Sequence, residues 1–170
     1  MRAKAYTNTQ SRQIKELEPV KNLFEKGRPE ELNDRVLRLM PESPRQWGKM
    51  DAAQAMAHCT LALDMASGDS NPPPGPLGLR ILGRLVKPLV LKDDEPLRRN
   101  VQTSPALVVA DERHLARECQ RLRIAIDRFA ASGPAGCTAH PHFFFGKLTP
   151  DQWAILMYKH VDHHLRQFGA

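Results

Sequence analysis

The residues best suited to carry chemistry are three histidines on stretches with helical, apolar spacing. His160 and His164 lie four residues apart near the C-terminus, and His58 lies in an alanine-rich stretch far upstream. Because a helix turns by about 100° per residue, His160 and His164 share one face with Trp153. The opposite arc of the same stretch holds charged residues: Lys159, Asp162 and Arg166. Both histidines are therefore expected to point inward.

Two imidazoles at positions i and i+4 of a helix can bind one divalent ion, and a third from a facing helix leaves positions open for water or substrate. His58 also points to an inward face, because Gln54 and Met65 lie within about 40° of it. We therefore predict a metal site made of His58, His160 and His164 in a helical core. Spacing alone leaves an alternative, in which interior histidines satisfy their nitrogens by ordinary hydrogen bonds.

The remaining histidines offer weaker ligand candidates. His163 is within reach of His160, but it falls at the margin of the inward face. His140 and His142 lie in a loop without a third partner, so a structural role is the simpler interpretation for both. A ligating histidine also needs a partner for its second ring nitrogen, and we expect Gln54 or a backbone carbonyl to supply it.

Four helical stretches must position these side chains, and no stretch shows convincing strand alternation. The helix that carries His58 is predicted over residues 51–66, with Asp51 as its N-cap. The helix that carries His160 and His164 is predicted over residues 150–168, because Thr149, Pro150 and Gln152 form a strong start signal. We expect an all-α protein, a four-helix bundle.

The other two bundle helices are predicted over residues 29–39 and 111–131. The second of these has a core-facing stripe: Leu115, Cys119, Leu122, Ile126 and Phe129. Residues 69–105 contain a proline cluster and an apolar stretch over 79–91 that Gly83 and Pro88 interrupt. We predict one or two short helices there, within a long crossover between the second and third bundle helices. An N-terminal arm or short helix is predicted over residues 1–27, ahead of a single domain over 28–170.

Composition excludes several classes of protein. A chain of 170 residues with 41% hydrophobic and 26% charged residues suits one globular domain, and it has neither a run of 18 apolar residues nor a signal-peptide pattern. Three cysteines without paired spacing, Cys59, Cys119 and Cys137, favour a reduced, cytoplasmic protein. The 25 Lys and Arg against 19 Asp and Glu are spread evenly, so we expect neither nucleic-acid nor membrane binding.

Two sequence blocks resemble the DUF1569 family of the DinB/YfiT-like superfamily, and the resemblance spans roughly residues 28–169. The first block is Trp47–Met50 with Ala53–Cys59, and the second is Phe145–Trp153 with Tyr158–Gly169. The resemblance implies a four-helix bundle with an up-down-down-up path. It also implies a metal site of one histidine from the second helix and an HxxxH pair from the fourth, which correspond here to His58, His160 and His164.

The resemblance further suggests a homodimer. The second side of the last helix is apolar as well, through Ile155, Tyr158 and Leu165. Packing against another helix of the same chain would explain these residues, and a contact between two copies is the alternative.

Relatives of this kind resemble metal-dependent enzymes that act on low-molecular-weight thiols. An open three-histidine metal would lower the pKa of a bound thiol or water. The first hypothesis is therefore a metal-dependent thiol S-transferase acting on a small electrophile. The alternatives are a hydrolase that uses metal-bound hydroxide and a non-catalytic metal- or ligand-binding bundle. Zinc, nickel, iron and manganese all suit imidazole and water ligands, so the identity of the metal stays open.

Overall fold

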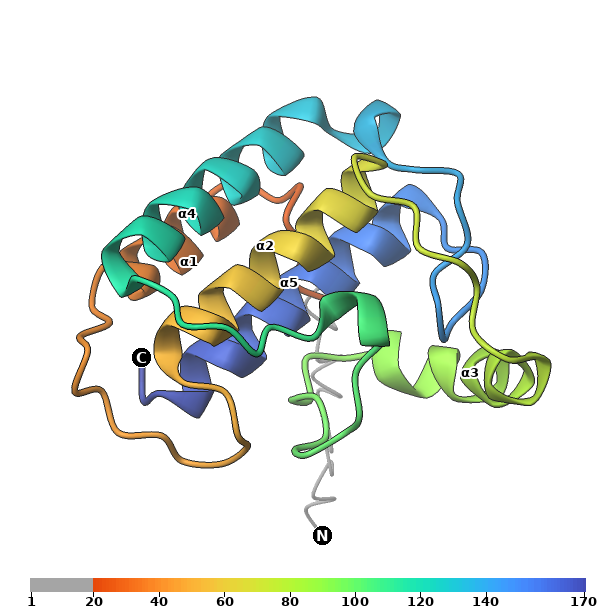
Figure 1. Ribbon diagram of the computed structural model, residues 1–170. Coiled ribbons are helices and arrows are strands. Elements are labelled where there is room, and N and C mark those ends of the chain that lie inside the picture. The colour runs from red at the N-terminus through yellow and green to blue at the C-terminus, as the bar shows by residue number, and fades with distance from the viewer. Residues whose placement is uncertain (1–19) are drawn as a thin grey trace, which may run out of the picture.

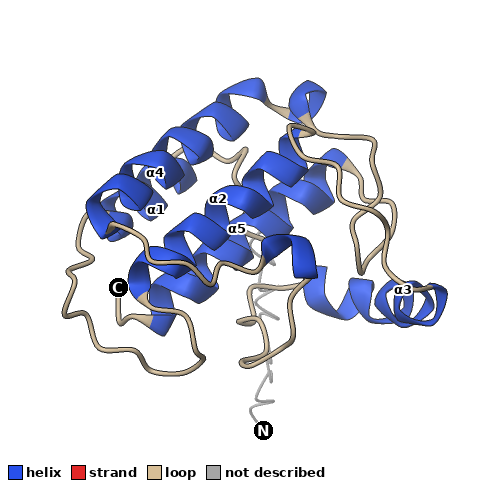
Figure 2. Cartoon of the chain, in the orientation of Figure 1, coloured by secondary structure: helices blue, strands red, loops and turns tan. Residues whose placement is uncertain are grey.

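A computed structural model describes residues 20–170, and helices make up all their regular structure (Figure 1). The helices are α1 (Arg28–Val36), α2 (Ala52–Ser67), α3 (Leu77–Leu91), α4 (Leu115–Ser132) and α5 (Pro150–Gln167), with short 3₁₀ turns η1 (Pro105–Leu107) and η2 (Pro134–Gly136). Within these residues no strand forms, and a lone bridge joins His142 to Gly146 (Figure 2). The predicted all-helical class is confirmed.

The two histidine-bearing helices begin where their capping signals predict. At the start of α2, the Asp51 side chain accepts a hydrogen bond from the backbone N–H of Gln54, whose own side chain accepts from Asp51 N–H. Thr149 and Gln152 form the same reciprocal pair at the start of α5. Such pairs satisfy backbone donors that a helix otherwise leaves free, so they fix the first turn of each helix.

Two helix boundaries differ from the prediction. The helix α1 ends at Val36 instead of residue 39, and α4 begins at Leu115 instead of residue 111. Asp111 pairs with Arg113 instead of capping the helix, and His114 is extended with φ −96° and ψ 113°. Asp111 therefore belongs to the loop before α4.

The apolar stretch of the crossover forms one continuous helix, α3, despite Gly83 and Pro88. Gly83 is needed for packing, because a Cβ at this position would collide with the carbonyl oxygen of Phe144. The glycine that suggested a break thus lets α3 approach the loop before α5.

The core lies among four of the helices. The helix α2 packs against α4 and α5, and α1 packs against the same two helices. Leu122, Ile126 and Phe129 of the predicted stripe are buried together, whereas Leu115 and Cys119 are half-buried at the edge of the core. In Figure 1, α3 extends away from this group of helices.

The apolar second side of α5 is explained by packing within the chain. Tyr158 and Leu165 are buried and Ile155 is half-buried against the core. The Tyr158 hydroxyl donates a hydrogen bond of 2.8 Å to Glu31 on α1. These side chains therefore do not supply the contact surface on which the homodimer prediction depended.

The predicted N-terminal arm lies largely outside the described residues, which begin at residue 20. Leu23, within the described part, is fully buried, and its N–H donates to the carbonyl of Ala154 on α5. In residues 20–170, none of the helices combines the length and the apolar character that a membrane span requires.

The packing of α4 against α2 predicts a large stability difference between two neighbouring apolar residues. Leu122 is fully buried, whereas Ile124 on the same helix is 59% exposed. We expect Leu122→Ala to lower the free energy of unfolding by about 2–5 kcal/mol, because it removes buried methyl groups and leaves a cavity. Ile124→Ala should change it by about 0.5 kcal/mol or less. Urea denaturation measures both, and equal losses would contradict this packing.

Candidate metal centre

The structure brings together the three histidines that the sequence singles out. His58 comes from α2, and His160 and His164 come from successive turns of α5. The ring centroid of His58 lies 4.8 Å from that of His160 and 4.9 Å from that of His164, and the latter two are 5.0 Å apart. One nitrogen from each ring lies within 4.8 Å of the others. The three are close enough to bind a metal ion.

His58 is oriented by a backbone carbonyl. Its Nδ1 lies 2.7 Å from the carbonyl oxygen of Leu107, in the 3₁₀ turn η1. A carbonyl oxygen only accepts, so Nδ1 carries the proton and the lone pair of Nε2 is free. Burial lowers the pKa of His58, which keeps the ring neutral and able to act as a ligand at neutral pH.

His164 is oriented by a chain of two hydrogen bonds. Its Nδ1 lies 2.8 Å from Oε1 of Gln167, and Nε2 of Gln167 donates to the carbonyl of Trp47 at 2.7 Å. Since the Trp47 carbonyl requires the amide NH₂ as donor, Oε1 faces His164 and accepts from its Nδ1–H. Burial lowers the pKa of His164 to about 3. The Nε2 lone pair of His164 is therefore also free.

The loop that holds Gln167 needs a glycine. Gly48 follows Trp47 and has a positive φ of 79°. A Cβ at this position would lie 2.6 Å from Nε2 of Gln167, so a larger residue would displace the amide. The Trp47–Gly48 pair thus positions His164 through Gln167.

His160 carries the unsatisfied atom of the cluster. Its Nε2 is buried and has no hydrogen-bond partner. Burial lowers the pKa of His160 well below its ordinary value, and the neighbouring His58 and His164 lower it further. A buried polar atom without a partner costs free energy, and a cation bound among the three rings would remove that cost. The donor set therefore fits a divalent metal.

The competing ligand His163 has another partner. Its Nε2 accepts a hydrogen bond from Nε1 of Trp47 at 3.4 Å, and its ring stands edge-on to that of His164. The geometry agrees with the helical-wheel argument that placed His163 at the margin of the inward face.

The two loop histidines each make local hydrogen bonds. His140 Nε2 lies 2.8 Å from the carbonyl of Pro72, which ties its loop to the proline cluster. His142 Nδ1 accepts from the N–H groups of Phe144 and Phe145, and burial lowers the pKa of this ring to about 4. Both contacts support the structural interpretation of these residues.

The partners of the second ring nitrogens were only partly predictable. A backbone carbonyl was anticipated, and that of Leu107 fills the role, but Gln54 does not. Its side chain completes the α2 cap and donates to the carbonyl of Asp111. Gln167 was missed as a partner. Its position three residues after His164, on the same inward arc, was the available signal.

The cluster has no nucleophile or general base of its own within residues 20–170. Burial raises the pKa of the Cys59 thiol far above neutral, and it raises that of Cys137 to about 11. No described carboxylate hydrogen-bonds to any of the three histidines. The cysteines are therefore held protonated, and the described hydrogen-bond partners of the cluster are a backbone carbonyl and an amide.

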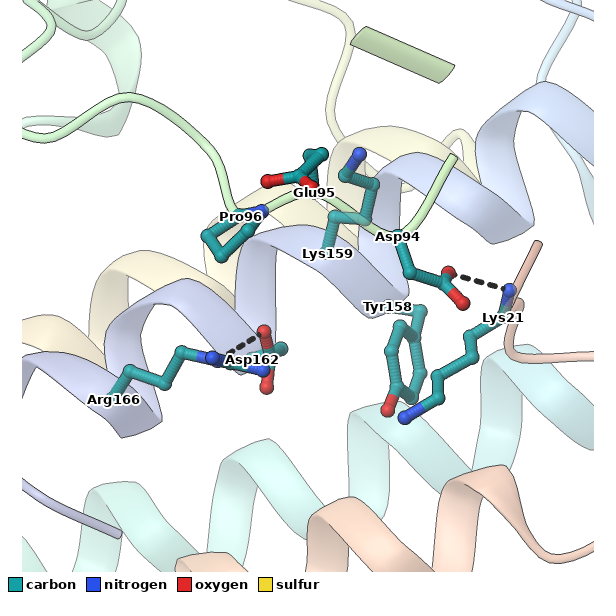
Figure 3. A pocket seen from close by; sticks show the side chains of 8 residues that line it. All are labelled: Lys21, Asp94, Glu95, Pro96, Tyr158, Lys159, Asp162 and Arg166. Atoms are coloured by element: carbon teal, nitrogen blue, oxygen red, sulfur yellow. Dashed lines mark hydrogen bonds and ion pairs between the residues drawn. The ribbon is translucent and has the colours of Figure 1, made fainter. Parts of the chain in front are cut away.

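The charged pocket on another side of α5 is a separate feature (Figure 3). Lys159, placed by the sequence on the charged arc, is in fact buried and donates to the carbonyls of Val90 and Asp93. Asp162 is paired with Arg35 and Arg166. Because these charges are bound within the chain, we assign the pocket no ligand.

Replacing any one of the three clustered histidines should remove most of the metal affinity. We expect His58→Ala, His160→Ala and His164→Ala each to weaken binding by more than about 100-fold, because loss of a residue that only hydrogen-bonds to a ligand already costs about 10–100-fold. His163→Ala is the matched control and should retain near-normal affinity. Calorimetric titration with Zn²⁺, with folding checked by circular dichroism, measures each variant. Loss of binding in His163→Ala but not in His164→Ala would overturn the ligand assignment.

Gln167 should influence the metal without touching it. Gln167→Met preserves bulk but removes the acceptor for His164 Nδ1–H, so Zn²⁺ affinity should fall by about 10–100-fold. Gln120→Met, the same change at an exposed position of α4, should leave it unchanged. Equal affinities in the two variants would show that Gln167 has no role in orienting His164.

The family match covers every helix described above. Residues 28–170 match the family described as "Protein of unknown function (DUF1569)". No curated protein and no solved structure matches the chain. Because this match covers most of the chain, the chain belongs to the DUF1569 family.

Proposed function

We propose that this protein is a metal-dependent enzyme, a thiol S-transferase that joins a low-molecular-weight thiol to a small electrophile. The observation that supports this most is the set of three neutral imidazoles, in which two Nδ1 atoms are held by oxygen acceptors and the Nε2 of His160 has no partner. His58, His160 and His164 would hold the metal. Three protein ligands are typical of catalytic sites, since structural zinc sites usually have four.

The bound metal would supply a Lewis acid that favours the deprotonated form of a thiol or water at neutral pH. An external thiol fits the site because the chain's own cysteines are held protonated by burial. In the transfer, the thiol sulfur forms a bond to the electrophilic carbon and the leaving group departs with its electron pair. The thiol proton goes to solvent, because no described carboxylate contacts the cluster.

The chain's residues would position the ligand rings and provide surroundings of low dielectric constant. They would contribute little acid–base chemistry. Leu107 and Gln167 hold two of the rings, so that the ligand nitrogens need not reorganise when the metal arrives. The buried surroundings would strengthen the electrostatic interactions of a metal held by these three histidines. The site is thus suited to stabilising a thiolate.

Several finer features belong to the same proposal. We propose that α1, α2, α4 and α5 form a four-helix bundle with the up-down-down-up path of the DinB/YfiT-like superfamily. The packing of α1 and α2 against both α4 and α5 supports this arrangement. The three free cysteines support a reduced, cytoplasmic setting.

A homodimer stays a prediction, and light scattering would test it against a monomer of 19.2 kDa.

The function is tested by thiol consumption with purified, metal-loaded protein. Glutathione and cysteine would be offered with chlorodinitrobenzene, and loss of free thiol would be followed over time. We expect turnover that a chelator abolishes and that His160→Ala lacks, because the variant loses one of the three ligands. Gln120→Met is the control and should be fully active.

Two outcomes would contradict the transferase proposal. Metal-dependent hydrolysis of nitrophenyl acetate, unaffected by thiol and without thiol consumption, would favour the hydrolase alternative. Stoichiometric metal binding without turnover of either kind would favour a non-catalytic metal- or ligand-binding protein.

A further inference from the structure

The helix α3 exposes an apolar face that the rest of the described chain does not cover. Of the eleven large hydrophobic residues exposed in residues 20–170, six lie on this one helix. Leu77, Leu85 and Leu89 are 69%, 71% and 63% exposed, and Ile81 and Leu82 are each about half exposed. The other five are scattered over different elements. A contiguous apolar surface of this kind marks an interaction site in a water-soluble domain.

The orientation of α3 is fixed by its opposite side. Gly83 is buried against the backbone of Phe144, Leu91 is buried in the core, and Val90 packs against it. Taking Gly83 as the inward direction, the exposed residues Leu77, Ile81, Leu82, Leu85 and Leu89 fall on an arc of about 140° centred opposite it. The apolar face is therefore held outward by the packing of the inner side. Figure 1 shows that α3 itself extends away from the other helices.

The charges of α3 all have one sign. Arg84 lies at one edge of the apolar arc, Lys92 follows the last turn, and the helix contains no Asp or Glu. Arg80 and Lys87 lie nearer the inner side, where Lys87 donates to the carbonyl of Lys147. Arg84 and Lys92 are exposed. Of the acidic residues that follow, Asp94 accepts from the N–H of Lys21 on the body of the protein (Figure 3), and Asp93 lies 3.8 Å from the Lys92 ammonium. An apolar face with a cationic edge is typical of helices that lie on membranes.

We propose that α3 is a membrane-surface helix that docks this protein on an anionic phospholipid bilayer. Its leucines and Ile81 would enter the boundary between headgroups and acyl chains. The exposed side chains of Arg84 and Lys92 would extend to the lipid phosphates. The docked helix would lie in the plane of the interface, which agrees with the finding that no described helix could span a bilayer.

Charge favours an anionic lipid surface over a second copy of the chain as the partner of α3. Pairing α3 with α3 in a symmetric dimer would bring cationic edges together, and the helix has no acidic residue to compensate them. An anionic lipid surface complements the same edge. The proposal departs from the expectation based on overall charge, because the cations and the exposed apolar residues converge only in the folded structure.

The test is co-sedimentation of the full chain with vesicles of phosphatidylglycerol, compared with vesicles of phosphatidylcholine. We expect binding to phosphatidylglycerol that Ile81→Gln combined with Leu85→Gln lowers by at least about tenfold. Arg84→Gln and Lys92→Gln should each lower it by about fivefold. Ile124→Gln and Arg117→Gln, equivalent changes at exposed positions of α4, should have no effect.

A second measurement does not depend on loss of binding. In Leu85→Trp, tryptophan emission should shift to the blue when phosphatidylglycerol vesicles are added, whereas Ile124→Trp should show no shift. Absence of binding, or equal binding to both lipids, would overturn the proposal. A dimer that Ile81→Gln with Leu85→Gln dissociates, in a protein that does not bind vesicles, would also overturn it and identify a second copy as the occupant.

Discussion

Burying three imidazole rings against one another is the constraint on which the rest of the structure depends. With centroids 4.8–5.0 Å apart, protonated rings would place like charges together in a poorly solvated interior. Burial accordingly lowers the pKa of all three histidines. A neutral imidazole has one donor and one acceptor nitrogen, so each donor needs an oxygen and each acceptor needs a cation or a donor. The chain supplies oxygen acceptors for the Nδ1–H groups of His58 and His164. It leaves the acceptor nitrogens of the rings free to bind a ligand.

The surrounding elements follow from that requirement. Capping boxes fix the first turns of α2 and α5, which set the rotation of each helix and hence the direction of its histidines. The loop before α2 brings the Trp47 carbonyl to Gln167, and the crossover brings the Leu107 carbonyl to His58. The long connection after α2 therefore has a role in the centre, besides carrying α3 on the outside of the protein.

Local signals predicted the helices that carry the site and the three clustered residues. Periodicity placed His160 and His164 on one face, and capping patterns located both helix starts, because these effects act over one or two turns. Periodicity also placed His58 on an inward face of its helix, and the resemblance of the two blocks to a known family led to the same three histidines. The helix α4 begins four residues later than the sequence suggested, and Asp111 pairs with Arg113 in the preceding loop.

Other features depend on contacts between distant parts of the chain and could not be predicted. The Leu107 carbonyl reaches His58 across a crossover whose path is set by packing. From the sequence, Gly83 suggests a break in the helix. Only the close approach of the Phe144 backbone explains why a glycine is needed there. Whether the apolar residues of α3 lie inside or outside depends on the same contact. The hydrogen-bond partners of a side chain near a helix end, such as Gln167, are similarly unpredictable until the position of the neighbouring loop is known.

X-ray absorption spectroscopy of the zinc-loaded protein tests the central claim most directly, because it reports the atoms that bind the metal. We expect three imidazole nitrogens at about 2.0–2.1 Å, with the remaining positions filled by light atoms of solvent. The multiple-scattering pattern of histidine rings should be present and should decrease in His160→Ala. A sulfur shell at about 2.3 Å, or a first shell of oxygen alone, would show that the three histidines do not form the metal centre.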